Sequence, residues 1–346
     1  MRAMASSPLD VLVDLAARAR AVARYDGVFW RRMAYFGAAH MPLWWRRYTP
    51  PAFGAAACTL LPRQREIVAK NLRTMGIAGS SVDAEIGALR TFLNFADCLT
   101  DGLDSMGRGL DGYHLASTND QRFKAAIKRG RGVVLLTAHT GSWEVIGRLI
   151  GKNHGAGVTM VMTEEQNTST RSFADALRTR DAGDLEVTYV GGDPLSALPL
   201  LKALRAGRIV ALQFDRVPRG MASVSVPFFG VMQPFPVGPF KLAQVTGAPL
   251  LAAFTRRTGY RTFAVDIPEA IEIGRGRGPA ADEAVRAAMA RVGQEFERFV
   301  RRYPSQWFHF EPLSEVPVSL AGARAGGGGP APWAASSRGT GTAMGK

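Results

Sequence analysis

Short apolar runs that alternate with helical stretches after Gly130 constrain the fold of this 346-residue chain more than any other feature. The runs are GVVLLTA, VTMVM, LEVTYV, RIVALQF, PLLAAF and RTFAVDI, which have the length and composition of strands. Amphipathic stretches such as PLSALPLLKALRAG separate them. Because strands that alternate with helices form layered folds, the sequence predicts an α/β core in which a mixed sheet is flanked by helices.

Helical patterns stand on both sides of this core. Within residues 63–97, the segments RQREIVAKNLRTMG and DAEIGALRTFLNFAD carry apolar residues at three- and four-residue spacing, which predicts two helices. A last amphipathic helix is predicted over residues 281–302, because it ends before Pro304 and a helix rarely continues through proline. SQWFHF then follows as a strand or an extended segment.

These patterns divide the chain into three parts. A helical, membrane-associating N-terminal region is predicted over residues 1–105, and the α/β core over residues 106–318. Residues 319–346 are rich in glycine and low in complexity, so they offer almost nothing to bury and are predicted to be a disordered tail.

The charge balance indicates the kind of partner. Lysine and arginine number 43 against 29 aspartates and glutamates, a net charge of +14 that favours an anionic membrane surface, nucleic acid or an acidic protein. The aromatic residues fall in apolar blocks and do not interleave with a basic stripe, so no nucleic-acid partner is expected. Cys58 and Cys98 form no CxxC or Cys/His spacing, so we expect neither a disulfide framework nor a metal site.

One N-terminal segment is suited to a lipid surface. FWRRMAYFGAAHMPLWWRR, residues 29–47, mixes tryptophan and phenylalanine with arginine, as interfacial helices do. The same pattern also fits an ordinary amphipathic helix that packs inward. Residues 220–240 carry no charge but contain four prolines, so they cannot form an ordinary spanning helix. We therefore expect the chain to attach to a membrane peripherally or by shallow insertion.

His139 is the first candidate for chemistry, because it follows the run GVVLLTA and precedes the helical stretch SWEVIGRLI. Catalytic groups of α/β sheets gather at the carboxyl ends of strands. Glu144 follows five residues later, and Gly141 permits a tight turn between the two. A carboxylate that folds back on the imidazole would fix its tautomer and let the other ring nitrogen take a proton from a hydroxyl group. A lone histidine at a strand end is also a common structural residue.

A family resemblance extends over much of the chain. TAHTGSWE resembles the His-x4-Asp/Glu motif of the glycerolipid and lysophospholipid acyltransferase superfamily, in the form found in bacterial lipid A late acyltransferases and phosphatidylinositol mannoside acyltransferases. RQREIVAKNL and LRTFLNFAD resemble the helical segments before that motif, and QFDR, VPFFG, GPFKLAQVTGAPLL and PSQWFHF resemble later blocks in the same order. The similarity is continuous over about residues 63–312.

This resemblance implies a glycerolipid acyltransferase-like fold and an enzyme at the cytoplasmic face of the cell membrane. An acyl group would pass from an acyl carrier protein or coenzyme A thioester to a hydroxyl of a membrane lipid or glycolipid, with no cofactor. His139 would be the general base and Glu144 would orient and charge it. Arg178, which aligns with a family arginine near the donor site, would meet the oxyanion or the donor phosphate, although it also fits a solvated helix arginine. The chain departs from the family at Met162-Thr163, where a Tyr-Arg pair is usual.

Further substrate contacts are expected from two later motifs. QFDR places Asp215 and Arg216 at the end of another predicted strand, where they would contact substrate or form an exposed ion pair. VPFFG supplies Phe228 and Phe229 as apolar surface for an acyl chain, or as plain core. The competing functional interpretation is a non-catalytic protein that binds a membrane or an acyl carrier and keeps the fold.

Overall fold

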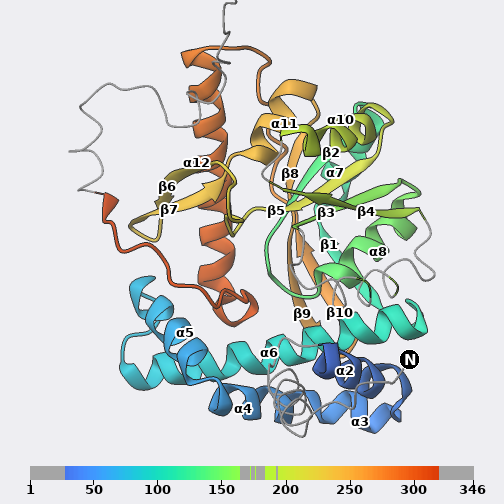
Figure 1. The fold of residues 1–346 in the computed structure, drawn as a ribbon, viewed down its shortest axis with the longest axis vertical. Coiled ribbons are helices and arrows are strands. Elements are labelled where there is room, and N and C mark those ends of the chain that lie inside the picture. The colour runs from blue at the N-terminus through green and yellow to red at the C-terminus, as the bar shows by residue number, and fades with distance from the viewer. Residues whose placement is uncertain (1–27, 164–171, 173–175, 177–183, 192–193, 319–346) are drawn as a thin grey trace, which may run out of the picture.

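The computed structural model describes residues 28–163, 172, 176, 184–191 and 194–318. The predicted tail and Arg178 lie outside these residues. The described part is built around one parallel sheet and a helical base (Figure 1).

Five parallel strands form the main sheet. Their order is β4 (Leu185–Val190), β3 (Val158–Thr163), β5 (Ile209–Gln213), β2 (Val133–Thr137) and β8 (Leu250–Ala252). Each of these strands falls within one of the predicted apolar runs or extends it by a single residue, which confirms the α/β prediction.

Burial on both faces explains why the central strands are apolar without interruption. Val133 and Leu135 of β2 join an apolar core with the helices α7 (Asp120–Lys128) and α8 (Trp143–His154). Alternate residues of the same strand belong to a second core on the opposite face, with α10 (Leu198–Arg205), α11 (Gly238–Thr246) and α12 (Pro279–Arg302). A parallel strand that helices cover on both sides has no position that faces solvent, so apolar and polar residues do not alternate along it.

Two smaller sheets complete the β-structure. β1 (His114–Thr118) pairs in parallel with β10 (Thr262–Asp266), which pairs antiparallel with β9 (Phe254–Gly259). The uncharged, proline-rich stretch forms the antiparallel hairpin of β6 (Ser223–Phe228) and β7 (Val231–Pro236). Within the described residues, no helix is both long and apolar enough to cross a bilayer.

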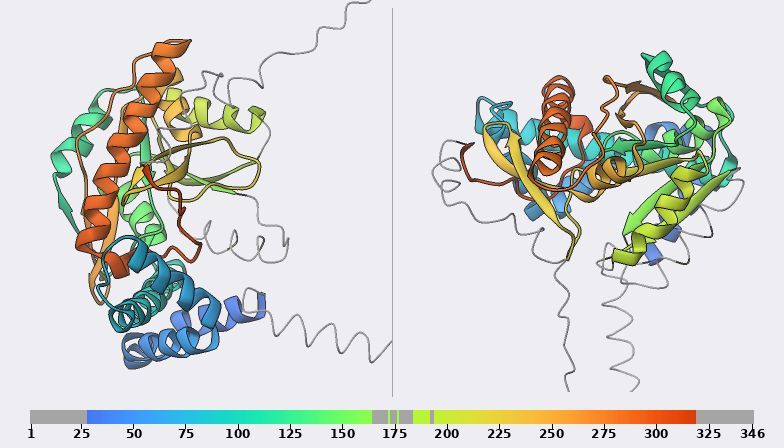
Figure 2. Two further views of the ribbon diagram at one scale, coloured as in Figure 1. Left: turned by 90° about the vertical axis from the view of Figure 1, so that its left-hand side faces the viewer. Right: turned by 90° about the horizontal axis from the view of Figure 1, so that it is seen from above.

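Helices form the base of the molecule, below the sheets in Figure 1 and at one end of the left view in Figure 2. They are α2 (Val28–His40), α3 (Leu43–Tyr48), α4 (Pro50–Leu60), α5 (Pro62–Thr74) and α6 (Ser81–Arg108). The two helices predicted within residues 63–97 are α5 and α6, and α6 continues eleven residues beyond the predicted segment. Ser80 caps α6 by accepting a hydrogen bond from the Asp83 amide.

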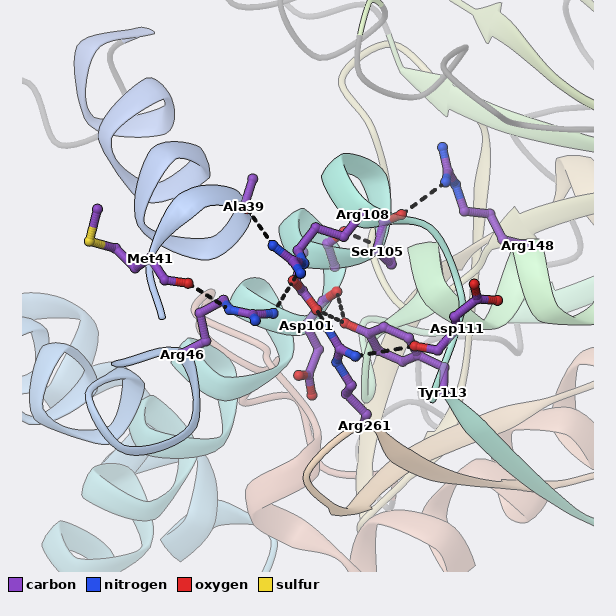
Figure 3. A network of polar contacts seen from close by, with 12 residues as sticks. Ala39, Met41, Arg46, Asp101, Ser105, Arg108, Asp111, Tyr113, Arg148 and Arg261 are labelled. Atoms are coloured by element: carbon purple, nitrogen blue, oxygen red, sulfur yellow. Dashed lines mark hydrogen bonds and ion pairs between the residues drawn. The ribbon is translucent and has the colours of Figure 1, made fainter. Parts of the chain in front are cut away.

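A buried ionic network fixes this base to the sheets. Asp104 of α6 accepts a hydrogen bond from Arg46 of α3 at 2.7 Å, forms an ion pair with Arg261 and accepts a 2.8 Å bond from the Tyr113 hydroxyl. Figure 3 shows these side chains converging on α6 from three separate segments. Because the carboxylate is buried and shared by three donors, α6 cannot shift relative to α3 or the β9–β10 turn without breaking ion pairs.

Candidate active site

The pairing of β2 with β5 brings His139 and Asp215 together. Thr137 and Gln213 are opposite each other in the parallel register. His139 lies two residues after Thr137, and Asp215 lies two residues after Gln213. The His139 ring nitrogen Nδ1 lies 2.8 Å from Asp215 Oδ1, and the His139 backbone N–H donates to the same oxygen at 3.1 Å. Two residues that are 76 positions apart in the chain thus form one pair at the carboxyl edge of the sheet.

Asp215 is held as a buried anion. It is 1% exposed, and Trp307 donates its indole N–H to the second carboxylate oxygen at 2.9 Å. Burial by itself raises the pKa of this carboxyl, but the charge and hydrogen bond of His139 and the charge of Arg216 hold the pKa well below its usual range. An ionised partner at Nδ1 places the proton there, so Nε2 of His139 carries the lone pair that can accept a proton.

The predicted extended segment after α12 forms one wall of the site. After the short 3₁₀ turn Pro304–Gln306, Trp307 pairs with Thr140 as an isolated β-bridge, and the Phe308 amide donates to the His139 carbonyl at 2.8 Å. These backbone bonds fix the segment that carries His139 and the indole that holds Asp215 in a single unit.

Gly141 is required by the backbone at this point. Its φ of +55° lies in the left-handed region, and a Cβ at this position would lie 2.8 Å from Thr255 Oγ1. Both the conformation and the close approach exclude a side chain without strain. Gly141 therefore serves the turn between His139 and α8, as the sequence predicted.

His139 opens into a pocket of about 230 Å³ between α6, α8 and the segment after Trp307. The side chain of His139 is 26% exposed, so the pocket can reach its ring. The lining residues are Phe95, Cys98, Leu99, Gly102, His139, Gly141, Ser142, Trp143, Glu144, Arg216, Phe308 and Phe310. Most of the lining is apolar, and it includes two large apolar residues of α6 that are exposed at the surface, Phe95 and Leu99.

Glu144 shares this pocket with His139, in the first turn of α8. Gly102 of α6 leaves space for it, since a Cβ there would lie 3.5 Å from Glu144 Oε2 and 3.3 Å from Ser142 Oγ. The carboxylate on Nδ1 of His139, however, is Asp215, which the sequence suggested as a substrate contact or as part of an exposed ion pair. Asp215 is identified by the pairing of β2 with β5, and the spacing of residues along the chain does not reveal which strands pair.

Arg216 is a half-buried cation in the pocket wall, and its guanidinium donates through Nη2 to the Phe308 carbonyl. Phe228 and Phe229 lie elsewhere, in an aromatic core behind the site. The Phe228 ring meets Trp307 edge to face, with ring centroids 5.7 Å apart. Phe228 supports the indole that binds Asp215, and neither phenylalanine lines the pocket.

A narrow apolar cavity of about 30 Å³ adjoins the pocket, beneath α8. Trp143 lines both spaces, and the cavity continues between Ile146, Ile150 and the strand residues Leu135 and Met160. Its lining is mostly apolar, with Thr137, Gln213 and Thr255 as the polar residues.

Comparisons with known proteins place these features among relatives. The profile of the bacterial lipid A biosynthesis acyltransferase family matches residues 110–313, more than half of the chain. A phosphatidylinositol mannoside acyltransferase of Mycobacterium tuberculosis is 28% identical over 189 residues, which span 54% of this chain and 56% of that protein. A protein of the same description from Mycolicibacterium smegmatis is 26% identical over 211 residues, 61% of this chain and 66% of that protein. The similarity thus spans somewhat more than half of each relative.

Proposed function

Since the chain belongs to the bacterial lipid A biosynthesis acyltransferase family, we propose that it transfers a fatty acyl group from a thioester to a hydroxyl group of a membrane lipid. The observation that supports this most is the His139–Asp215 pair at the mouth of a largely apolar pocket. A base with a free Nε2 beside an apolar wall is what an attack by a lipid hydroxyl on an acyl thioester requires.

The proposed reaction is direct acyl transfer. Nε2 of His139 takes the proton of the acceptor hydroxyl while the hydroxyl oxygen forms a bond to the thioester carbonyl carbon. The carbonyl becomes a tetrahedral oxyanion, which collapses as the carbon–sulfur bond breaks, and the departing thiolate takes the proton from the imidazolium. The Asp215 anion stabilises the imidazolium between the two proton transfers.

The oxyanion needs a cation or N–H donors. Arg216 lines the pocket, and α8 also begins there. Ser142 is the N-cap residue of α8, and its side chain makes no capping hydrogen bond. A fixed guanidinium and the positive end of a helix both stabilise charge that develops in a transition state. We assign the oxyanion to Arg216 and α8. We propose that Arg178 binds the phosphate of the donor. We propose that Glu144 is a second carboxylate, which orients the imidazole or the acceptor hydroxyl.

Exposed aromatic residues on the helical base support a membrane role. Trp30 on α2, Trp44 on α3 and Phe53 on α4 are all exposed, as are other large apolar side chains of the same helices. Arg31, Arg32 and Arg47 belong to the same segments, and arginines among exposed aromatics match an anionic lipid headgroup layer. Because α4 packs on α6 and α6 lines the pocket, we propose peripheral binding at the cytoplasmic face with the pocket near the lipid.

The acceptor and donor are proposed from the relatives and from charge. Two relatives carry the description phosphatidylinositol mannoside acyltransferase, so we propose a glycolipid hydroxyl as the acceptor. Acyl carrier protein and coenzyme A are both donors of acyl thioesters, and the net charge of +14 favours the acidic carrier protein. The apolar cavity beneath α8 would receive part of the acyl chain.

Purified protein tests this function directly. It is incubated with acyl carrier protein or coenzyme A thioesters and with a total lipid extract, and the lipids are examined by mass spectrometry. We expect one lipid class to gain one acyl chain and one free thiol to appear for each chain. A protein that binds liposomes and the acyl carrier, but forms no acylated lipid under any of these conditions, is the non-catalytic binding protein instead.

A further inference from the structure

His309 is a buried imidazole whose polar atoms have no evident use in folding. It is 5% exposed, and neither Nδ1 nor Nε2 has a hydrogen-bond partner among the described residues. Burying a polar group without a partner opposes folding, so such a group in a well-packed core calls for a functional explanation. The residue follows Trp307 by two positions, directly behind the candidate site.

One face of His309 supports the base. Its ring stacks on the Trp307 indole, with centroids 4.5 Å apart and planes inclined by 22°. The same indole donates its N–H to Asp215, and Asp215 holds His139. Removing the stacked ring would free the indole to tilt, which would loosen the carboxylate that fixes the His139 tautomer.

Arg216 lies next to His309, because its Nη2 donates to the carbonyl of Phe308, the residue that directly precedes His309. Arg216 has a buried Nε–H that also lacks a partner among the described residues, although its Nη2 donates to Phe308. Burial lowers the pKa of His309 to about 4; the Asp215 anion opposes this, and the charges of Arg216 and His139 add to it. A neutral imidazole keeps one lone pair, which is the acceptor that an unpaired guanidinium N–H lacks.

We propose that His309 is a positioning residue for both charged groups of the pocket. Its ring face holds Trp307, and its ring lone pair accepts the Arg216 Nε–H through one bridging water. This inference rests on the proposed acyl transfer, in which Arg216 stabilises the oxyanion. It explains why an imidazole and not a phenyl ring stands at this position: phenylalanine would fill the space and stack, but it would leave the Arg216 Nε–H without an acceptor.

A double-mutant cycle separates this role from plain packing. His309→Phe keeps the stack and removes the acceptor, and Arg216→Ala removes the group that it positions. We expect His309→Phe to lower kcat by about 10-fold with the donor KM within about twofold, because the oxyanion contact exists only in the transition state. In the Arg216→Ala background the same change should cost less than about twofold. His154→Phe is the matched control, since His154 lies against Phe123 away from the pocket.

Equal losses from His309→Phe in both backgrounds would overturn the inference while leaving acyl transfer intact. If the wild-type protein transfers no acyl group, the proposed function fails, and the inference is then decided by nuclear magnetic resonance. A slowly exchanging Arg216 Nε–H signal, assigned by its loss in Arg216→Lys, is expected in wild-type protein and should broaden or disappear in His309→Phe. An unchanged signal in that variant contradicts the proposed contact.

Discussion

Asp215→Asn tests which carboxylate orients His139. The carboxylate accepts from the His139 ring, the His139 backbone and the Trp307 indole. An asparagine amide offers one oxygen and turns its NH₂ group toward the other donors, so at least one N–H loses its acceptor. Hydrogen bonds to charged groups contribute about 1.5–3 kcal/mol each, so we expect a loss of about 2–4 kcal/mol in the free energy of unfolding.

The catalytic effect should be larger than the effect on stability. Without the anion, His139 loses its preferred tautomer and the charge that stabilises imidazolium, and the expected fall in kcat is about 10³- to 10⁴-fold. Thiol release at saturating donor and acceptor measures kcat, and circular dichroism with urea measures folding under the same conditions. Glu144→Gln makes the same chemical change in the same pocket and is expected to cost about 10-fold. A fall of about 10³-fold in Glu144→Gln, with Asp215→Asn within about 10-fold of wild type, would refute the assignment.

Three other outcomes follow from single positions. In urea titrations, Gly141→Ala should lower the free energy of unfolding by about 2 kcal/mol more than Gly76→Ala. Both glycines have a positive φ, but only Gly141 lies against β9, so equal losses would contradict the close approach. His309 has a folded pKa of about 4 against an ordinary 6.5, so the free energy of unfolding falls as the pH falls from about 6.5 to about 4, because only the unfolded imidazole takes up a proton in that range. His309→Phe should remove about 3 kcal/mol of that acid destabilisation, and an unchanged slope between these pH values would exclude it. Trp44→Ser, at a side chain 60% exposed, should weaken sedimentation with anionic liposomes by about 10-fold without changing the melting temperature, and undiminished binding would move the lipid contact elsewhere.

The strands of the main sheet were predictable because their physical cause is local. A strand buried on both faces must be apolar at nearly every position, and the alternation of such runs with amphipathic helices leaves few other folds. The β6–β7 hairpin was not predicted as strands, because its prolines and alternating burial disguise the pattern, although its exclusion as a spanning helix is confirmed. Helices α5, α6 and α12 were found from their periodicity.

The candidate site was predictable only in part. His139, Gly141 and Glu144 come from one short motif, so local sequence places them near each other. The partnership of His139 with Asp215 depends on which strands are neighbours, and no spacing along the chain reveals that order. Phe228 illustrates the same limit, because a phenylalanine has the same composition signal in a core as in an acyl pocket.

Formation of acylated lipid by His139→Ala protein, at saturating thioester and acceptor, tests the central claim most directly. Loss of the general base should lower this rate by about 10²- to 10⁴-fold with the fold intact, while His114→Ala, at an exposed histidine of β1, should leave it unchanged. Mass spectrometry of the lipid product gives the rate, and circular dichroism verifies the fold. Acylation by His139→Ala at the wild-type rate would contradict the account.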